Sequence, residues 1–476
     1  MKDSIEKDKA RFDAVGQKQV FAFWDQLNPE EQVNLTTDIH AIDLDEVEQL
    51  VREHVKGKAV ATVSLDGLTP APYVPHPARG GDPDLWARAR EAGEDALRGG
   101  RVAAFTVAGG QGTRLGYDGP KGTFPVTPVT GKTLFGVFAD KIRAAEIRYG
   151  VEIPWLIMTS TLNHVATVRA FEEAGYFDLK PEQVLFFSQG RMPAVDFEGK
   201  ILLQSRDQVA MTPDGHGGSL RAMVRSGAVG ELKRHGIDII SYFQVDNPLV
   251  QVIDPAFIGF HILQKSEMSG KMIPKAYPGE KVGHYCMQDD RMCVIEYSDM
   301  PMEMQEKRDG SGRLQFLSGS ISINILDVDF VDRVGSGREG AALPFHKAVK
   351  KIQTIDGQGN PVSPEEPNGV KFEMFVFDAL PFARNPLVIE TLREDDFSPV
   401  KNPSGVDSAE SCKADQIRQW TRWLKAARVE LETDETGLPG INFEISPIFA
   451  DSEEALVERW LALDEKPAIT EGAILQ

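Results

Sequence analysis

A glycine-rich loop with two basic residues is the segment of this sequence best suited to chemistry. Val107-Ala108-Gly109-Gly110 continues into Gln111-Gly112-Thr113-Arg114-Leu115-Gly116, and Lys121 follows after Pro120. Glycines let backbone amides approach a ligand that side chains would otherwise exclude, and the two cations add fixed positive charge. The loop follows an apolar run, residues 102–107, which reads as a buried strand. The pattern predicts a polyphosphate site and therefore nucleotide chemistry.

The spacing of the glycines excludes two common nucleotide motifs. A dinucleotide fingerprint G-x-G-x-x-G would need glycine at Leu115, but the glycine falls one residue later, at Gly116. Gly131-Lys132-Thr133 matches the end of a Walker loop, but its first glycine would have to stand at Val126. We interpret that segment as a turn before a helix. A glycine-rich connection without a ligand is the alternative for the main loop, and its four glycines with an arginine argue against it.

Composition limits the class of protein. A chain of 476 residues exceeds one ordinary core, so two or three domains are expected. The net charge of −20 argues against nucleic-acid or anionic-membrane partners, which require a basic face. Three cysteines without a C-x-x-C pair indicate reduced thiols, and the charged N-terminus has no apolar signal core, so a cytoplasmic location is expected.

The chain divides into three predicted regions. Residues 1–95 read as a helical lobe followed by a proline-rich linker over residues 70–83 that packs along the surface. Residues 96–402 read as the catalytic domain and 403–476 as a small C-terminal lobe.

Within the central region, strands alternate with helices, which is typical of a mainly parallel α/β sheet. Strands are predicted at Val102–Val107, Trp155–Met158, Val184–Phe187 and Ile239–Val245, and helices at Leu134–Tyr149, Leu162–Ala174 and Ser219–His235. The candidate motifs follow strand ends, which is where open parallel sheets bind ligands.

Eight ordered motifs resemble the UDP-sugar pyrophosphorylase family, most closely its N-acetylglucosamine branch. The resemblance runs from about Phe12 to about Ile448. Besides the glycine-rich loop, the matching segments are residues 157–160, 186–190, 211–218, 245–247, 296–298, 368–371 and 393–402. The resemblance implies a Rossmann-like nucleotidyltransferase (GT-A-like) fold with a mixed, mainly parallel sheet flanked by helices.

The reaction implied by the resemblance joins UTP and a sugar-1-phosphate to give a UDP-sugar and pyrophosphate. The sugar phosphate is already ionised, so no protein nucleophile is needed, and catalysis consists of aligning two anions and stabilising charge. Cationic side chains and a divalent metal ion, Mg²⁺ or Mn²⁺, are the expected means.

Four cations and one carboxylate receive roles through the resemblance. Arg114 is expected to clamp the terminal phosphates and Lys121 to reach the α-phosphate. Lys371 and Lys401 are brought over the phosphates from distant segments, and Asp246, at a strand end, holds the metal ion. Without the family context, Asp246 would read as a turn cap and each lysine as a solvated surface group.

The uridine site implied by the family uses an amide side chain and backbone groups. Gln189 offers one donor and one acceptor to uracil, and the backbone of Val107, Ala108, Gly109, Gly110 and Gly215 can supply the others. Taken alone, Gln189 would be better interpreted as a turn residue before Gly190.

The sugar pocket departs from the N-acetylglucosamine branch at two positions. His216 and Ser320 stand where that branch has asparagines, and UDP-glucose pyrophosphorylases resemble this chain in having the histidine. Gly283 and Glu296, which line the pocket in the family, are retained. N-acetylglucosamine-1-phosphate is therefore the expected substrate, with glucose-1-phosphate or a broad sugar range as alternatives. A non-catalytic nucleotide-binding protein would be expected to lose some of Arg114, Lys121 and Asp246.

Overall fold

The computed structural model describes residues 2–57 and 65–476, which fall into two compact units. The first unit comprises residues 1–64, 189–221 and 342–378, and the second comprises residues 65–188, 222–341 and 379–476. Among the residues described, none of the helices combines the length and the apolar character that crossing a bilayer requires.

The second unit is built on a ten-stranded mixed sheet in the order β1-β11-β13-β9-β2-β3-β4, with β10, β12 and β18 attached at its sides. Its strands are β1 (Thr69–Pro70), β2 (Val102–Val107), β3 (Trp155–Thr159), β4 (Val184–Ser188), β9 (Ile239–Gln244), β10 (Met268–Pro274), β11 (Gly283–Gln288), β12 (Arg291–Ile295), β13 (Ser318–Asp327) and β18 (Leu387–Glu390).

The four predicted strands form a continuous parallel part of this sheet, in the order β9-β2-β3-β4, and β10 and β18 make a further parallel pair. Apart from the partly exposed β4, their residues are almost entirely buried, as expected for a parallel sheet covered on both faces. β13 runs antiparallel to β9 and makes the sheet mixed. The predicted α/β class is therefore confirmed.

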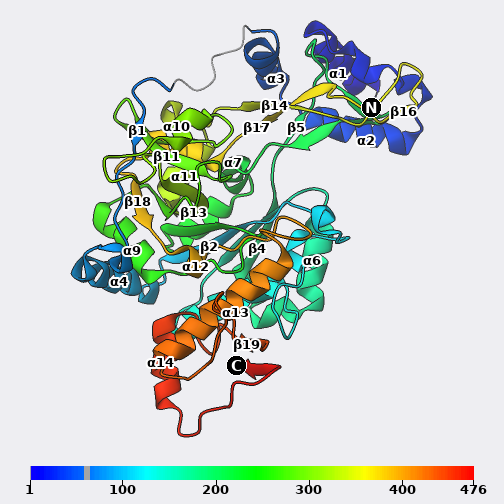
Figure 1. Ribbon diagram of the computed structural model, residues 1–476. Helices are drawn as coiled ribbons and strands as arrows, with labels where there is room; N and C mark the ends of the chain where they lie inside the picture. The colour runs from blue at the N-terminus through cyan, green and yellow to red at the C-terminus, as the bar shows by residue number, and fades with distance from the viewer. Residues whose placement is uncertain (1, 58–64) are drawn as a thin grey trace. The chain divides into compact units, whose positions relative to one another are not determined.

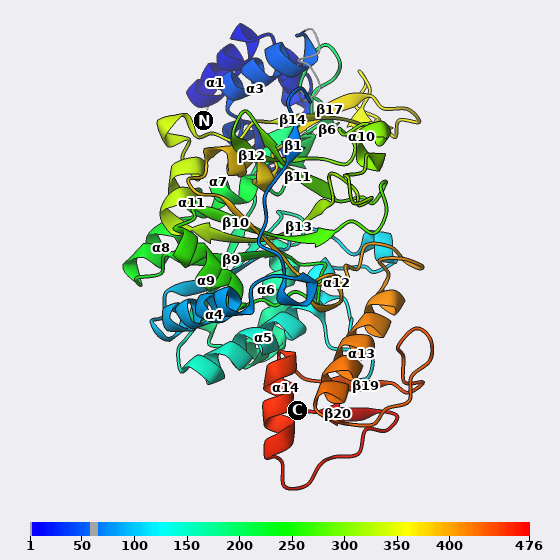
Figure 2. The same ribbon diagram turned by 60° about the vertical axis from the view of Figure 1, so that its left-hand side comes forward.

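Helices cover this sheet and pack closely on one another (Figure 1). They are α4 (Pro83–Arg98), α5 (Leu134–Tyr149), α6 (His164–Glu173), α8 (Ala228–Arg234), α9 (Pro255–Gln264), α10 (Met302–Glu306), α11 (Val328–Gly335) and α12 (Arg393–Asp396). α4 and α9 lie side by side in both views (Figures 1 and 2), and glycines allow their close contact. A methyl group at Gly93 would lie 1.8 Å from the Pro255 carbonyl oxygen, and one at Gly259 would lie 1.6 Å from that of Ala89.

The predicted helix over residues 219–235 is wrong in one respect, because two helices occupy this stretch. α7 (Gly218–Arg225) ends before Gly227, which has φ +82°, and α8 begins at Ala228. A left-handed residue cannot continue a right-handed helix, and glycine adopts that conformation readily.

The C-terminal part of the second unit has a hydrophobic core of its own. It consists of α13 (Ala409–Ala426), β19 (Phe443–Ile445), α14 (Glu453–Ala462) and β20 (Ala473–Leu475) (Figure 2). Trp420, Trp423 and Trp460 are buried in this core together with Phe443.

The first unit combines N-terminal helices with short strand pairs. Its elements are α1 (Lys2–Ala14), α2 (Pro29–His40), α3 (Leu44–Leu50), β5 (Arg191–Pro193), β6 (Leu203–Ser205), β7 (Gln208–Val209), β8 (Met211–Pro213), β14 (His346–Lys350), β15 (Thr354–Ile355), β16 (Pro361–Val362) and β17 (Gly369–Glu373). Gln17 joins the helices to the strands, because its amide donates to the Gly199 carbonyl oxygen and accepts from the Ile201 N–H. Pro29 occupies the first turn of α2 after an Asn28 cap.

Buried neutral histidines make the stability of the fold dependent on pH. Burial lowers the pKa of His261 on α9 to about 3, and its Nδ1 lies 2.9 Å from Ser269 Oγ. Above pH 6.5 neither the folded nor the unfolded state binds a proton at this residue, whereas between pH 6.5 and 3 only the unfolded state does. As the pH falls from 7 to 5, protonation of this histidine in the unfolded state should therefore lower the free energy of unfolding by about 2 kcal/mol. His261→Gln should flatten the pH dependence by that amount in urea titrations, and an unchanged slope would contradict the assignment.

Candidate functional site

The glycine-rich loop leaves β2 and folds back on itself. The Gly112 N–H donates to the Gly119 carbonyl oxygen at 2.9 Å, and the Lys121 N–H donates to that of Gly110 at 3.1 Å. Lys121 is thereby held next to the start of the loop. Within the described residues, the amides of Gly109 and Gly110 donate to no other part of the chain, so they can donate to a ligand.

Two further glycines of this loop are required by close packing. A methyl group at Gly112 would lie 2.7 Å from the Tyr117 ring, and one at Gly122 would lie 2.1 Å from the Phe135 ring. The Tyr117 and Phe135 rings therefore pack directly against the backbone at these two glycines. Arg114 stands exposed on the short 3₁₀ helix Thr113–Leu115, where its guanidinium is available to a ligand.

Asn163 fixes the base of the loop, a role that sequence reasoning missed. Its side chain is fully buried, and its amide donates to the carbonyl oxygens of Ala108 at 2.9 Å and Gly110 at 3.1 Å. Its own oxygen accepts from the Ser160 N–H. The sequence did offer a signal, because an asparagine five residues after a predicted strand lies at the same sheet edge as the loop.

The predicted cation and carboxylate meet at the carboxyl edge of the parallel strands. Asp246 follows β9, and its Oδ2 lies 3.6 Å from Lys121 Nζ. The side chains are 15% (Lys121) and 20% (Asp246) exposed, so both can also contact a ligand. Two residues 125 positions apart are thus brought together, as expected for segments that follow the carboxyl ends of parallel strands.

Lys401 reaches the same edge from the segment after α12. The Val400 N–H donates to the Asp246 carbonyl oxygen at 2.7 Å, and Lys401 Nζ lies 5.6 Å from the centre of the Phe397 ring. The Lys401 N–H donates to the Asp407 carbonyl oxygen at 2.6 Å.

Asp407 is a second residue that the sequence analysis missed. Burial raises the pKa of its carboxyl group, the Lys401 ammonium lowers it, and the Asp246 carboxylate raises it. Asp407 also has φ +58°, an uncommon conformation for a residue other than glycine. Asp246, Lys401 and Asp407 therefore share one electrostatic environment in the second unit.

Three predicted sugar-contacting residues also gather in the second unit. Gly283 on β11 pairs directly with Ser320 on β13, and a methyl group at Gly283 would lie 3.5 Å from Glu296 Oε1. A hydrogen bond from the Ser320 side chain lowers the pKa of Tyr285, although burial raises it overall to about 12.

A buried hydrogen-bond chain lies next to these residues. Lys275 Nζ donates to His284 Nε2 at 2.6 Å and to Gln305 Oε1 at 3.2 Å, and His284 Nδ1 lies 3.3 Å from the Ile295 carbonyl oxygen. Burial lowers the pKa of Lys275 to about 8, and burial together with the Lys275 ammonium lowers that of His284 to about 4. His284 is therefore neutral and fixes the residue that precedes Glu296.

The other predicted residues belong to the first unit. Gln189 is the first residue after β4, which is the last strand of the second unit before the chain enters the first. Gly215, with φ +84°, packs against the Met374 backbone, whose carbonyl oxygen accepts from the Gly217 N–H at 2.8 Å. Lys371 Nζ is paired with Glu373 Oε1 at 2.6 Å, a partner that the sequence analysis did not foresee.

His216 is fixed by one hydrogen bond and by contacts with two aromatic rings. Its Nδ1 accepts from the Val376 N–H at 3.2 Å, and its ring packs on Phe375 and Phe377. Burial lowers its pKa to about 4, so the ring is neutral and carries its proton on Nε2. That N–H is the one group through which this histidine can donate.

A cavity of about 550 Å³ in the second unit contains none of the predicted residues. Its walls include Trp86, Lys141, Gln251, Asp396 and Trp423. The cavity is therefore not formed by the residues of the proposed phosphate edge.

A family model and individual relatives both match most of this chain. Residues 78–414 match the family described as UTP–glucose-1-phosphate uridylyltransferase. The chain is similar to a UDP-N-acetylhexosamine pyrophosphorylase-like protein 1 of Xenopus tropicalis, with 36% identity over 92% of this chain and 88% of the relative. It is also similar to UDP-N-acetylglucosamine diphosphorylase 2 of Arabidopsis thaliana, with 33% identity over 93% of this chain and 89% of the relative.

A solved structure shares the fold of nearly the whole chain. The uridine diphosphate N-acetylglucosamine pyrophosphorylase of Trypanosoma brucei, in complex with an inhibitor, superposes with a TM-score of 0.82. The two are 26% identical, and the match covers 98% of this chain and 97% of that structure.

Proposed function

Because the chain belongs to the UTP–glucose-1-phosphate uridylyltransferase family, we propose that it transfers the uridylyl group of UTP to N-acetylglucosamine-1-phosphate. Formation of a UDP-sugar with release of pyrophosphate is the activity of the family. The choice of sugar is supported by the names of relatives that match more than nine-tenths of the chain. The observation that carries the catalytic part is the Lys121–Asp246 pair beside open loop amides.

The chemistry requires two polyanions to be held in line. A phosphate oxygen of the sugar-1-phosphate attacks the α-phosphorus of UTP, and the bond from that phosphorus to the bridging oxygen of pyrophosphate breaks. We assign Lys121 to the α-phosphate, where negative charge accumulates, and Arg114 to the leaving pyrophosphate. Lys401 and the amides of Gly109 and Gly110 add further donors.

The residues at this edge fit a divalent metal ion that is shared with the substrate. Among the described residues, no three His, Cys, Asp or Glu side chains come together as a metal-binding cluster. Asp246 supplies one carboxylate, and Mg²⁺ commonly uses one or two carboxylates together with phosphate oxygens and water. When bound, Mg²⁺ would neutralise charge on the phosphates, and Asp246 would hold it.

In the first unit, Gln189 and the Gly215 backbone are assigned to the uracil base, as the family resemblance implies. Lys371 is assigned to the phosphates, and its bond to Glu373 then sets the direction of its ammonium group.

Glucose-1-phosphate is the alternative acceptor, because Ser320 and His216 lack the amide groups found in the N-acetylglucosamine branch. A pocket without such an amide loses less binding free energy when the sugar lacks the N-acetyl group, since no buried donor is left unpaired. We therefore expect measurable activity with glucose-1-phosphate alongside the preferred N-acetyl sugar. The test is pyrophosphate release from UTP with a panel of sugar-1-phosphates, and no release with any N-acetylated sugar would refute the proposal.

The Ser320→Asn variant tests how this preference arises. An asparagine amide here should shift the ratio of kcat/KM toward the N-acetyl sugar by roughly tenfold, which corresponds to one regained hydrogen bond of about 1.4 kcal/mol. Ser320→Ala is the matched control, because it also loses the bond to Tyr285 but adds no amide. If both variants give the same ratio, Ser320 does not distinguish the sugars. His216→Asn can be measured in the same way.

A further inference from the structure

Two segments that carry proposed active-site residues are joined directly behind Asp246. Asn247 Nδ2 donates to the Asp396 carbonyl oxygen at 2.6 Å, and the Ser398 N–H donates to Asn247 Oδ1 at 3.0 Å. Val400 adds its bond to the Asp246 carbonyl oxygen. The position of Lys401, the next residue, is therefore tied to that of Asp246.

Asp396 lies at the centre of this junction. Its carboxylate accepts from the Gln251 N–H at 2.9 Å, from Thr391 Oγ1 at 2.5 Å and from Lys271 Nζ at 2.6 Å. The residue is only 3% exposed. It thus joins the loop after β9 to the end of α12 through both its backbone and its side chain.

Lys271, in the middle of β10, supplies the buried charge on which Asp396 depends. Its side chain is 2% exposed, and its Nζ also lies 2.7 Å from Asp254 Oδ2. Burial alone would lower the pKa of this lysine, but the two carboxylates raise it, so it stays protonated. Removing one member of such a cluster leaves an uncompensated buried charge and a strong drive to rearrange.

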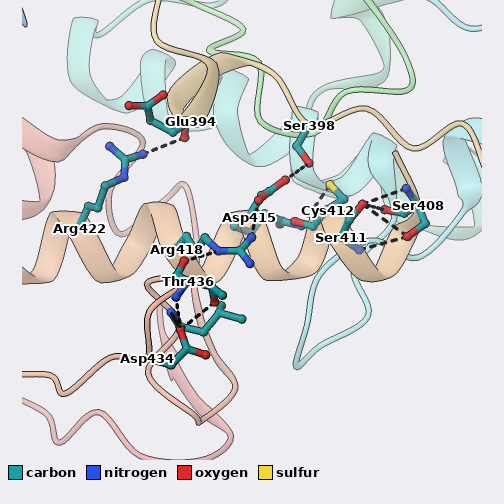
Figure 3. A network of polar contacts seen from close by, with 12 residues as sticks. Glu394, Ser398, Ser408, Ser411, Cys412, Asp415, Arg418, Arg422, Asp434 and Thr436 are labelled. Carbon is teal, nitrogen blue, oxygen red and sulfur yellow. Dashed lines mark hydrogen bonds and ion pairs between the residues drawn. The ribbon is translucent and has the colours of Figure 1, made fainter. Parts of the chain in front are cut away.

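α13 holds the same segment from its other side (Figure 3). Ser398 Oγ donates to Asp415 Oδ2 at 2.7 Å, and Arg422 Nη2 donates to the Glu394 carbonyl oxygen at 2.8 Å. Residues 394–398 are thus fixed between α13 and the junction around Asp396. A displacement of Asp396 must therefore be passed on to Ser398, Val400 and Lys401.

We propose that Lys271 is a positioning residue for uridylyl transfer, fixing through Asp396 and Asn247 the relative placement of Asp246 and Lys401. This inference rests on the proposed roles of Asp246 and Lys401. The Lys271 ammonium is enclosed by Asp254, Asp396 and the Phe257 ring, and so acts at a distance through the hydrogen bonds described above.

The experiment compares three variants of the full chain, with Lys271→Arg as a fourth variant that tests for rescue. Lys271→Met keeps the length of the side chain and removes its charge. Asn247→Ala leaves the ion cluster intact but removes the two side-chain bonds between the segments, so it tests the same link if Lys271→Met folds poorly. Arg333→Met is the control, because it breaks a partly buried ion pair with Glu267, at 2.5 Å and 15–17% exposed. Glu267 lies four residues before Lys271, but the hydrogen bonds given for this pair do not involve Asp396 or Asn247.

Three quantities are measured: kcat per folded molecule, melting temperature and Mn²⁺ binding in the presence of UTP by electron paramagnetic resonance. A displacement of about 1 Å at a reacting centre costs up to ~10²-fold. We therefore expect Lys271→Met and Asn247→Ala to lower kcat by about 10- to 100-fold and to raise the half-saturating Mn²⁺ concentration severalfold. Arg333→Met should lower only the melting temperature.

The outcomes separate this inference from the function on which it rests. If both test variants lose melting temperature but keep wild-type kcat and Mn²⁺ binding, the cluster is structural only and the inference is overturned. If the wild-type protein does not bind Mn²⁺ with UTP, the metal role of Asp246 itself fails. Restoration of kcat in Lys271→Arg, which keeps the charge, would support the inference.

Discussion

Lys121→Met is expected to lower kcat by about 10²- to 10³-fold, the loss typical of removing one preorganised donor to a transition state. Lys121 is held in place by the bond from its own N–H to Gly110, and its ammonium lies 3.6 Å from Asp246 Oδ2. The variant keeps the backbone bond and loses only the charge. Steady-state rates of pyrophosphate release measure the effect, and the melting temperature should change little because the pair is partly exposed.

Lys132→Met is the matched control for this prediction. Lys132 lies eleven residues further along the chain, and its ammonium pairs with Asp140, which lies within α5. Its removal changes the net charge of the protein by the same amount without touching the proposed phosphate edge. Comparable losses of kcat in the two variants would show that general electrostatics, and not a local donor, explains the effect.

The architecture of the second unit could be predicted because its strands are continuous apolar runs. β2, β3, β4 and β9 were placed to within one residue, since a parallel strand covered on both faces must be apolar throughout. Prediction failed at the helix over residues 219–235, where one left-handed glycine separates α7 from α8. Periodicity averages over a whole segment and does not detect a single interruption of this kind.

The candidate site was predictable where a residue follows a strand. Asp246 and Lys121 could be placed together because the carboxyl ends of parallel strands meet at one edge. Asn163 was missed although its place after a strand was a signal, whereas Asp407 depends on contacts with a neighbouring segment that has no sequence signature. Glu373 was missed because its pairing with Lys371, two residues away on the same strand, was not considered. The Lys271–Asp396 pair joins residues 125 positions apart, and a lysine within a strand gives no sign of its burial.

Asp246→Ala is expected to abolish metal-dependent pyrophosphate release, with a loss of at least ~10²-fold. The side chain is the only carboxylate that we assign to the metal ion, so Mn²⁺ binding in the presence of UTP should weaken in parallel. The protein should remain folded, because the bond that holds this position, from the Val400 N–H, is made to the backbone oxygen and is retained.

Asp238→Ala is the control for this last prediction, because Asp238 precedes the same strand, β9, at its opposite end. Its carboxylate pairs with Arg101 at 2.6 Å and is half exposed, so its loss removes one acidic group without reaching the carboxyl edge of the sheet. Both variants make the same change in charge, and only Asp246→Ala should lose Mn²⁺ binding and activity. If Asp246→Ala retained Mn²⁺ binding and activity, the metal ion would have to be held by the nucleotide phosphates alone. The role of the residues after β9 would then be limited to the hydrogen bonds of Asn247 and of the Asp246 backbone.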